Sequence, residues 1–557
     1  MSRPPPLRSL ATVAYLAIAS FGVTAAWGGT DPFFNPLTQS TAVASPNHVN
    51  ELNSPWQIPP GLSQRNLTSL KEAEADATQS IQRVPFGGVS SMFDMLAYDP
   101  SGRYIFIPHE TPFGAGLSRY DTMEDRTDLL FAGDSMASDF GACWGQACPA
   151  WASDFAAFDP ARWTPNGTVL LGEEWSGLGR IVEILDPLGD APEDPIVTSL
   201  VEGEDYRILD SIAKVAHEGI NFSRRFPNRV IYYIDEWNSG SIYALVLKTP
   251  GDYTGGGQTF VLSVDAFMET GGDPAAMWNE GVNENAQRFG LATWVPITDA
   301  DGTPLSGVND PFMDGPTVDP RERSDVRGGR AAADDVGGTP YGRPEDMEVG
   351  MLANFNEVLY VAITSEHSVI SIEMLGNRKA IVREFATAES AKNVGFAATT
   401  GTLNSPDNLA QDALGNIYII EDSPNSGDVG GDIWFGRDTD GNGVAESLDH
   451  FMSIQVAGSE STGMIFHPLN PEKFVVAVQH PSSTDLEEVP DGFGDAVWEF
   501  DVSNAVPPPC DDGGSLFAAV APLDTSCTSR VGNPFASDLR AAAERGPATR
   551  APLNARW

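Results

Sequence analysis

The chain has 557 residues and carries 77 acidic against 33 basic side chains, a net charge of −44 at neutral pH. Because the acids are spread along the whole sequence, the charge argues against nucleic acid and anionic membrane surfaces as partners. The length allows several domains or one large repeat fold, and the acidic surface suits a protein that works in salty water or gathers divalent cations.

The first residues have the pattern of a secretory signal peptide. Arg3 and Arg8 precede an apolar run from Leu10 to Val23, and small residues at 24–26 offer a cleavage site. An uncleaved anchor is the alternative, but the apolar run is shorter than the roughly 20 residues that a membrane span requires. We therefore predict that residues 1–26 are removed and that the mature protein is secreted, periplasmic or extracellular, with no membrane span.

The four cysteines fit an oxidising compartment. Cys143 and Cys148 lie five positions apart in C-W-G-Q-A-C, and Cys510 and Cys527 bracket a loop near the C-terminus. We expect two local disulfides. A zinc site is the alternative, but no histidine stands at ligand spacing beside either pair.

After a loop-rich segment (residues 27–85) with a short helical patch around residues 70–81, the chain becomes a series of short β runs. One pattern recurs over residues 86–505: a turn, four or five apolar β-prone residues, and a polar or acidic end, followed by a second strand. The repeats begin at Asp99, Thr164, Phe226, Asn354, Asp412 and Asn470. They predict an all-β fold, a β-propeller of about six blades. A β-sandwich would not as readily explain acids at equivalent strand ends.

The spacing of the repeats is interrupted once. Residues 249–341 are rich in Gly, Asp and Asn, and we predict a large loop insertion, or lid, between the third and fourth repeats. A separate small domain is the alternative. Residues 506–557 form the predicted C-terminal tail.

The acids at the strand ends, and in the turns before the strands, are the candidate functional residues. In a propeller the inner strands converge on one axis, so residues far apart in sequence meet at the same end. Hard cations such as Ca²⁺ require several oxygen ligands. A single acid here is more simply a solvated loop residue, but the recurrence of acids at equivalent positions predicts a metal site.

Several of these segments resemble the PhoX-type alkaline phosphatases. The motifs are A-H-E-G at Ala216, R-P-E-D at Arg343, S-P-D-N-L at Ser405 and G-S-E-S-T-G at Gly458, and they occur in the family's order. The resemblance extends from about Asp94 to Asp501. It implies a secreted six-bladed propeller that hydrolyses small-molecule phosphate monoesters at a cluster of iron and calcium ions.

The resemblance also implies roles for individual residues. Arg343 and Asn408 would bind the substrate, with the guanidinium of Arg343 on the phosphate oxygens, and Arg343, Glu345 and Glu218 would carry the catalysis. Alternatively, Arg343 is half of an ion pair at the rim and Asn408 belongs to an Asx turn. The expected metal ligands are Glu110, Glu174, Glu218, Glu345, Asp407, Asn408 and Glu460.

One departure from the family bears on the metal. Gly172 stands where the phosphatases have a cysteine that ligates iron. The remaining ligands are oxygen atoms, which favour calcium as the cofactor and put iron in question. Two alternatives follow: a catalytically altered propeller that serves as a calcium-stabilised binding or surface protein, or a hydrolase of another ester. The presence of Arg343 favours a phosphate ligand.

A second metal signal lies in one hairpin loop, D-T-D-G-N-G-V-A-E-S-L-D. Its spacing matches a calcium loop with a glycine at the sharp turn, and an ordinary acidic turn is the alternative. We predict a structural calcium site there, separate from catalysis, with ligands from Asp438, Asp440, Asn442, the Val444 carbonyl, Glu446 and Asp449.

Overall fold

The computed structural model describes residues 31–43, 53–76, 92–111, 113–135, 153–175, 179–313, 328–423, 427, 429–481 and 494–506. The predicted signal peptide, all four cysteines and the tail from residue 507 lie outside the described residues. Within these ranges, none of the helices has both the length and the apolar character needed to cross a membrane.

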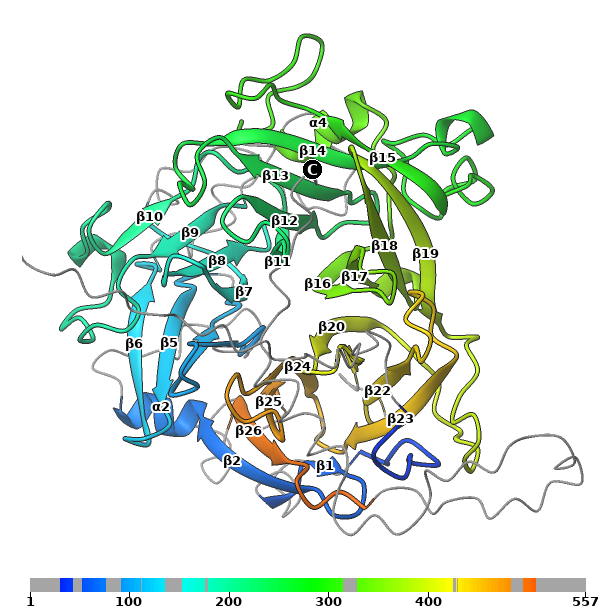
Figure 1. The fold of residues 1–557 in the computed structure, drawn as a ribbon. Coiled ribbons are helices and arrows are strands. Elements are labelled where there is room, and N and C mark those ends of the chain that lie inside the picture. Colours follow the sequence, from blue (N-terminus) through cyan, green and yellow to red (C-terminus); the bar gives the residue numbers. More distant parts are fainter. Residues whose placement is uncertain are drawn as a thin grey trace, which may run out of the picture.

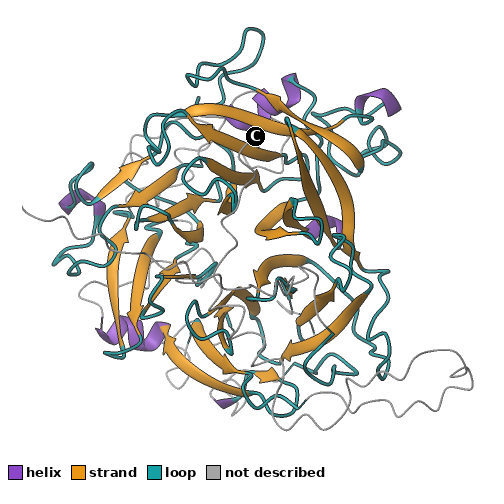
Figure 2. Ribbon diagram, in the orientation of Figure 1, coloured by secondary structure: helices purple, strands orange, loops and turns teal. Residues whose placement is uncertain are grey.

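The regular secondary structure of the described residues is almost entirely β-strand, and the sheets are arranged around a common axis (Figures 1 and 2). Two sheets of four strands come first in the chain. The first contains β3 (Ala97–Tyr98), β4 (Tyr104–Pro108), β5 (Gly116–Asp121) and β6 (Arg126–Ala132). The second contains β7 (Phe158–Trp163), β8 (Val169–Glu173), β9 (Ile181–Ile184) and β10 (Tyr206–Ile208).

A sheet of nine strands follows. It consists of two four-stranded units that are joined edge to edge by β15 (Gly290–Pro296), which pairs with β14 on one side and β19 on the other. The first unit is β11 (His217–Phe222), β12 (Val230–Asp235), β13 (Ile242–Leu247) and β14 (Gly257–Val264). The second is β16 (Pro344–Met351), β17 (Glu357–Ile363), β18 (Ser368–Gly376) and β19 (Lys379–Thr387).

The last two sheets each take a strand from the N-terminal part of the chain. One contains β20 (Pro406–Gln411), β21 (Ile417–Glu421), β22 (Asp432–Arg437) and β23 (Ser447–Ile454), with β1 (Trp56–Gln57) at its edge. The other contains β24 (Glu460–Phe466), β25 (Lys473–Gln479) and β26 (Ala496–Asp501), completed by β2 (Ser63–Ser69). The helices in the described part of the chain are α2 (Leu70–Asp76), α4 (Gly328–Asp335) and three single 3-10 turns, Val197–Ser199, Met268–Thr270 and Thr364–Glu366.

The innermost strands close a ring. β3, β7, β11, β16, β20 and β24 each contact the next, and β24 contacts β3. The prediction of an all-β propeller is confirmed. Hydrogen bonding among the described residues gives five sheets, because β15 joins two of the six units.

Two features of the sheets were not predicted. Residues 63–69 lie in the segment that we expected to be loops, yet β2 pairs along its length with β26 and closes the ring between the N-terminal and C-terminal parts. Residues 249–341, which we expected to be a loop insertion, supply the sheet strands β14 and β15 as well as α4. The segment is therefore partly built into the third unit.

Candidate metal centre

A β-bulge on four of the innermost strands aims an acid toward the axis. The pairing register shifts between Phe158 and Ala161 on β7, and equivalent shifts occur on β11, β16 and β20. A bulge leaves extra residues unpaired and re-aims their side chains. The first residue in each of these bulges is an acid: Asp159, Glu218, Glu345 and Asp407. In the first unit Asp94 has the equivalent place, directly after Phe93, which bridges to His109.

The second strand of each unit delivers another side chain to the same end. The residue after the last paired position of this strand is an acid in four units: Glu110, Glu174, Glu236 and Asp422. Thr364 and His480 take this position in the other two units. Hence the acids arise from two recurring positions of one repeat.

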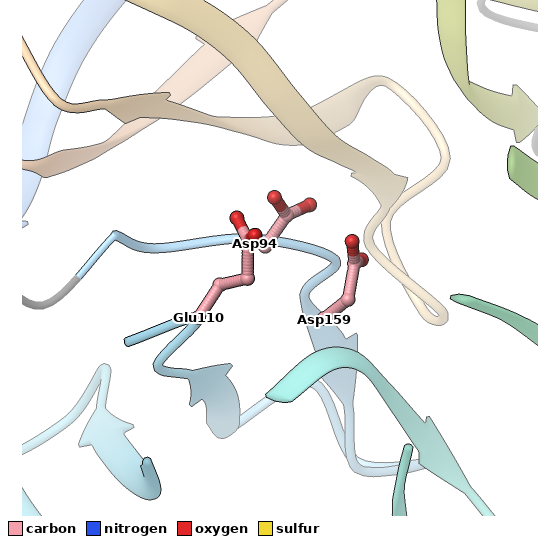
Figure 3. Close-up of side chains that lie close together, drawn as sticks. All are labelled: Asp94, Glu110 and Asp159. Atoms are coloured by element: carbon pink, nitrogen blue, oxygen red, sulfur yellow. The ribbon is translucent and has the colours of Figure 1, made fainter. Parts of the chain in front are cut away.

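All of these acids except Asp422 belong to three groups whose ligand atoms lie within 4.8 Å of one another. Glu218 belongs to two of them, with Glu345 and Asp407 on one side and with Glu174 and Glu236 on the other. These two groups therefore contain four of the predicted ligands, and a fifth, Glu110, belongs to the third group. The third group is Asp94, Glu110 and Asp159, whose carboxylates gather at one point from separate segments (Figure 3).

Burial controls the protonation of these carboxyls. Loss of hydration raises the pKa of Glu110 and of Glu345 to about 7. Burial, followed by repulsion from neighbouring carboxylates, raises the pKa of Glu218 and Asp407 well above its usual range. Without a bound cation, these carboxyls thus retain their protons to a higher pH than exposed carboxyls do. A bound divalent cation would favour their ionised form.

Some buried carboxylate oxygens have no hydrogen-bond partner among the described residues. They include Asp94 Oδ1, Asp159 Oδ1 and Glu345 Oε2. A buried acceptor without a donor is costly unless a cation satisfies it. Oxygen-only donors with unsatisfied lone pairs fit a hard cation such as calcium.

Arg343 is the cation that the fold places beside this cluster. Its Nε contacts a carboxylate oxygen of Glu236 and lies 3.4 Å from Glu345 Oε1. The field of Glu345, and then that of Glu236, raises the pKa of the guanidinium. Its side chain is 37% exposed, so Arg343 lies between the buried acids and solvent.

The other two predicted residues have partners inside the protein. The Asn408 side chain donates from Nδ2 to Asp407 Oδ2 at 3.2 Å, and its Oδ1 accepts a hydrogen bond from the Gly463 backbone. Glu460 Oε1 lies 3.1 Å from Nε2 of His480. The roles of Asn408 in substrate binding and of both residues in metal ligation stay predictions.

Hydrogen bonds beside the bulges join each innermost strand to the next. They tie the units together all the way round, so they hold the acids at fixed separations. Donor and acceptor pairs are Ala161 N to Met95 O, Arg162 Nε to Ile220 O, Asn221 Nδ2 to Met347 O, Leu409 N to Asp346 Oδ2, Gly463 N to Asn408 Oδ1 and Thr462 Oγ1 to Phe93 O.

Gly172, where the resemblance implies a cysteine, lies at a crowded position. A Cβ built there would lie 2.9 Å from both His217 Cβ and Pro160 Cγ, so neighbouring groups would have to shift. The described residues include no cysteine, and they provide no thiolate to this centre.

The predicted calcium loop is only partly assembled as a site. Carboxylates of Asp438, Asp440 and Glu446 come within 4.8 Å of one another. Asp449 instead forms an ion pair with Arg437, with 2.9 Å between Oδ2 and Nε. The structure thus separates the last predicted ligand from the group.

Three members of the cluster were not among the predicted metal ligands: Asp94, Asp159 and Glu236. A signal for the first two was available, because M-F-D-M at residues 92–95 and F-D-P-A at residues 158–161 align with P-E-D-M and P-D-N-L of the later repeats. Both lie on the first strand of a unit, whereas the recognised pattern was that of the second strand.

Comparisons with known proteins find a matching family and similar solved structures. The family described as "Alkaline phosphatase PhoX" matches residues 207–482. The structure of Pseudomonas fluorescens PhoX in complex with vanadate, a transition state analogue, has a TM-score of 0.51 and 14% identity, covering 84% of this chain and 98% of that chain. A gluconolactonase from Xanthomonas campestris has a TM-score of 0.35 and 9% identity, covering 84% and 96%. Among curated protein sequences, none matches this chain.

Proposed function

Because the chain belongs to the PhoX alkaline phosphatase family, we propose that it is an exported, metal-dependent phosphomonoesterase. The observation that carries this proposal is the position of Arg343, a partly exposed guanidinium in contact with acids of a buried carboxylate cluster. A phosphate ester needs cationic partners for its oxygens, and this arrangement supplies a fixed one beside a site suited to divalent cations. Export rests on the predicted signal peptide at residues 1–26.

Glu218, Glu345, Asp407, Glu174 and Glu236 would hold the cations, with Glu218 between two groups. Bound cations supply charge neutralisation of the phosphate and activation of the attacking oxygen. Arg343 orients the phosphoryl oxygens through its fork of N–H donors. The buried walls around the acids keep water from competing for these charges.

Calcium is the proposed cofactor. The carboxylate donors suit a hard cation, and Asp94 and Asp159 add oxygens that the family resemblance had not indicated. No step of the proposed reaction depends on iron.

The crowded position of Gly172 favours a second candidate, a calcium-stabilised propeller of altered chemistry that binds a ligand or acts on another ester. The two candidates differ in one measurable respect. Only the first predicts turnover of a phosphate monoester.

The test is hydrolysis of a simple aryl phosphate at alkaline pH, before and after a chelator strips the protein. We expect activity to disappear on chelation and to return with calcium. No turnover by a folded, calcium-loaded protein would reject the phosphatase proposal in favour of the second candidate.

A further inference from the structure

The segment between the third and fourth repeats supplies a buried arginine to the support of the carboxylate cluster. Arg330 lies on α4 (Figure 1) and donates from Nε to Asp235 Oδ2 at 2.7 Å and from Nη2 to Asp235 Oδ1 at 2.8 Å. The side chains are 9% and 0% exposed. This is a bidentate pair between residues 95 positions apart, and it is shielded from solvent.

Asp235 is adjacent to a member of the cluster. It ends β12, and the next residue, Glu236, groups with Glu174 and Glu218 and contacts Arg343. Asp235 Oδ1 also accepts a hydrogen bond at 3.1 Å from the backbone of Ala216, two residues before Glu218. One carboxylate therefore holds both chain segments that carry the acids of this group.

The same arginine reaches the loop of Arg343. Its guanidinium lies over the ring of Trp237, 5.2 Å from the centroid, and the Trp237 carbonyl accepts a hydrogen bond at 3.0 Å from the Arg343 backbone. The contacts of Arg330 thus lead to the acids on one side and to Arg343 on the other.

The second unit has a comparable pair at the equivalent position. There Glu173, next to Glu174, pairs with Arg180, at 2.6 Å from Nε and 2.7 Å from Nη2. That arginine directly precedes β9 of the same sheet, whereas the third unit obtains its arginine from a separate helix. Breaking a buried pair leaves an uncompensated carboxylate, so the rest of the unit cannot easily replace Arg330.

We propose that Arg330 is a positioning residue, which acts through Asp235 to fix Glu236 for cation binding and Arg343 for the phosphate. Helix α4 is then a working part of the site. The expected effect of Arg330 on phosphate turnover rests on the proposed phosphatase function. The expected effect on cation affinity does not.

The experiment compares Arg330→Ala with Arg383→Ala. The calcium affinity of each chelator-stripped full chain is measured by calorimetric titration with calcium. Arg383 is a matched control, because it pairs with the buried Glu373 of β18 at 2.5 Å and has no contact with the cluster among the described residues. Partners that orient metal ligands typically change metal affinity by about 10- to 100-fold. We expect a loss of this size for Arg330→Ala alone, with partial recovery on adding guanidinium ions.

Arg330→Lys provides a second variant if the alanine variant fails to fold. It retains the charge but loses the planar fork, so we expect weaker calcium binding and a lower kcat for aryl phosphate. Wild-type calcium affinity in a folded Arg330 variant would overturn the proposal, even if its melting temperature falls as in Arg383→Ala. Absence of turnover in the wild-type chain would instead reject the phosphatase function and leave the calcium comparison decisive for Arg330.

Discussion

Four non-glycine residues with a left-handed backbone stand two positions before acids of the cluster. Met92, Ala157, Arg343 and Ser405 have φ angles of 42°, 47°, 56° and 44° and precede Asp94, Asp159, Glu345 and Asp407. Such a conformation costs about 1–3 kcal/mol and persists where the surrounding structure enforces it. Its recurrence indicates that a tight turn and a bulge together direct each acid, so the geometry was repeated with the unit.

Replacing Arg343 by lysine tests the phosphate-binding role. Lysine keeps the charge but cannot offer two parallel donors. A hydrogen bond to a charged group contributes about 1.5–3 kcal/mol, so we expect kcat/KM for an aryl phosphate to fall roughly 10- to 100-fold. Steady-state kinetics would measure this, with Arg383→Lys as the control. Unchanged kcat/KM would show that Arg343 is only a partner of the acids.

Replacing Glu345 by glutamine tests the metal-binding role. The amide has the size of the carboxylate but lacks its charge, so cation binding by the group of Glu218, Glu345 and Asp407 should fail. We expect loss of activity with a retained fold, measured by aryl phosphate turnover and circular dichroism. Glu384→Gln, at an exposed site on β19, is the control. Wild-type turnover in Glu345→Gln would show that the ligands lie elsewhere.

Among the strands, those that are buried on both faces could be predicted from the sequence. β12 (V-I-Y-Y-I-D) is buried along its whole length, and this continuous apolar run with an acidic end made the repeat recognisable. β2 (S-Q-R-N-L-T-S) has exposed, polar positions in its first half. Its strand conformation depends on pairing with β26, more than 400 residues away, and no local pattern indicates such a partner.

The candidate site could also be predicted only in part. Glu218, Glu345 and Asp407 were found because each stands before a recognised second strand, and the structure groups them. The partners of Asn408 and Asp449 could not be read from the sequence. Gly463 lies on a neighbouring unit, and Arg437 competes for a carboxylate that the loop spacing alone assigns to calcium.

The hairpin loop at residues 438–449 gives a prediction at this scale. If it binds calcium, Asp440→Ala combined with Glu446→Gln should remove one bound calcium per chain and reduce the rise in melting temperature that calcium produces. Elemental analysis and thermal unfolding measure these two effects, and kcat should stay unchanged. An unaltered calcium content would assign the loop to an ordinary acidic turn.

The whole molecule should respond to pH through its buried carboxyls. Folding raises the pKa of Glu110 and Glu345 from 4.5 to about 7, so between these values the folded state binds more protons than the unfolded state. Without cations, the free energy of unfolding should therefore decrease as pH rises from about 5 through 7. Thermal unfolding at pH 5, 6, 7 and 8 in chelator would measure this decrease.

Saturating calcium should oppose this decrease, because it binds the ionised carboxylates. The same unfolding series with calcium serves as the comparison. A chelated protein that becomes more stable as pH rises over this interval would contradict the protonated, cation-free cluster.

The closure of the ring also determines when, during synthesis of the chain, the site can be completed. Gln479, from the last unit, donates hydrogen bonds to Asp94 and Glu110 of the first unit, at 2.8 and 2.6 Å. A chain that is still being synthesised lacks this seam, because Gln479 and β26, which pairs with β2, come late in the sequence. Until the last unit is made, the carboxyls of Asp94 and Glu110 lack the amide that pairs with them in the closed ring. The first group of acids therefore reaches its final surroundings only after almost the whole chain has been synthesised.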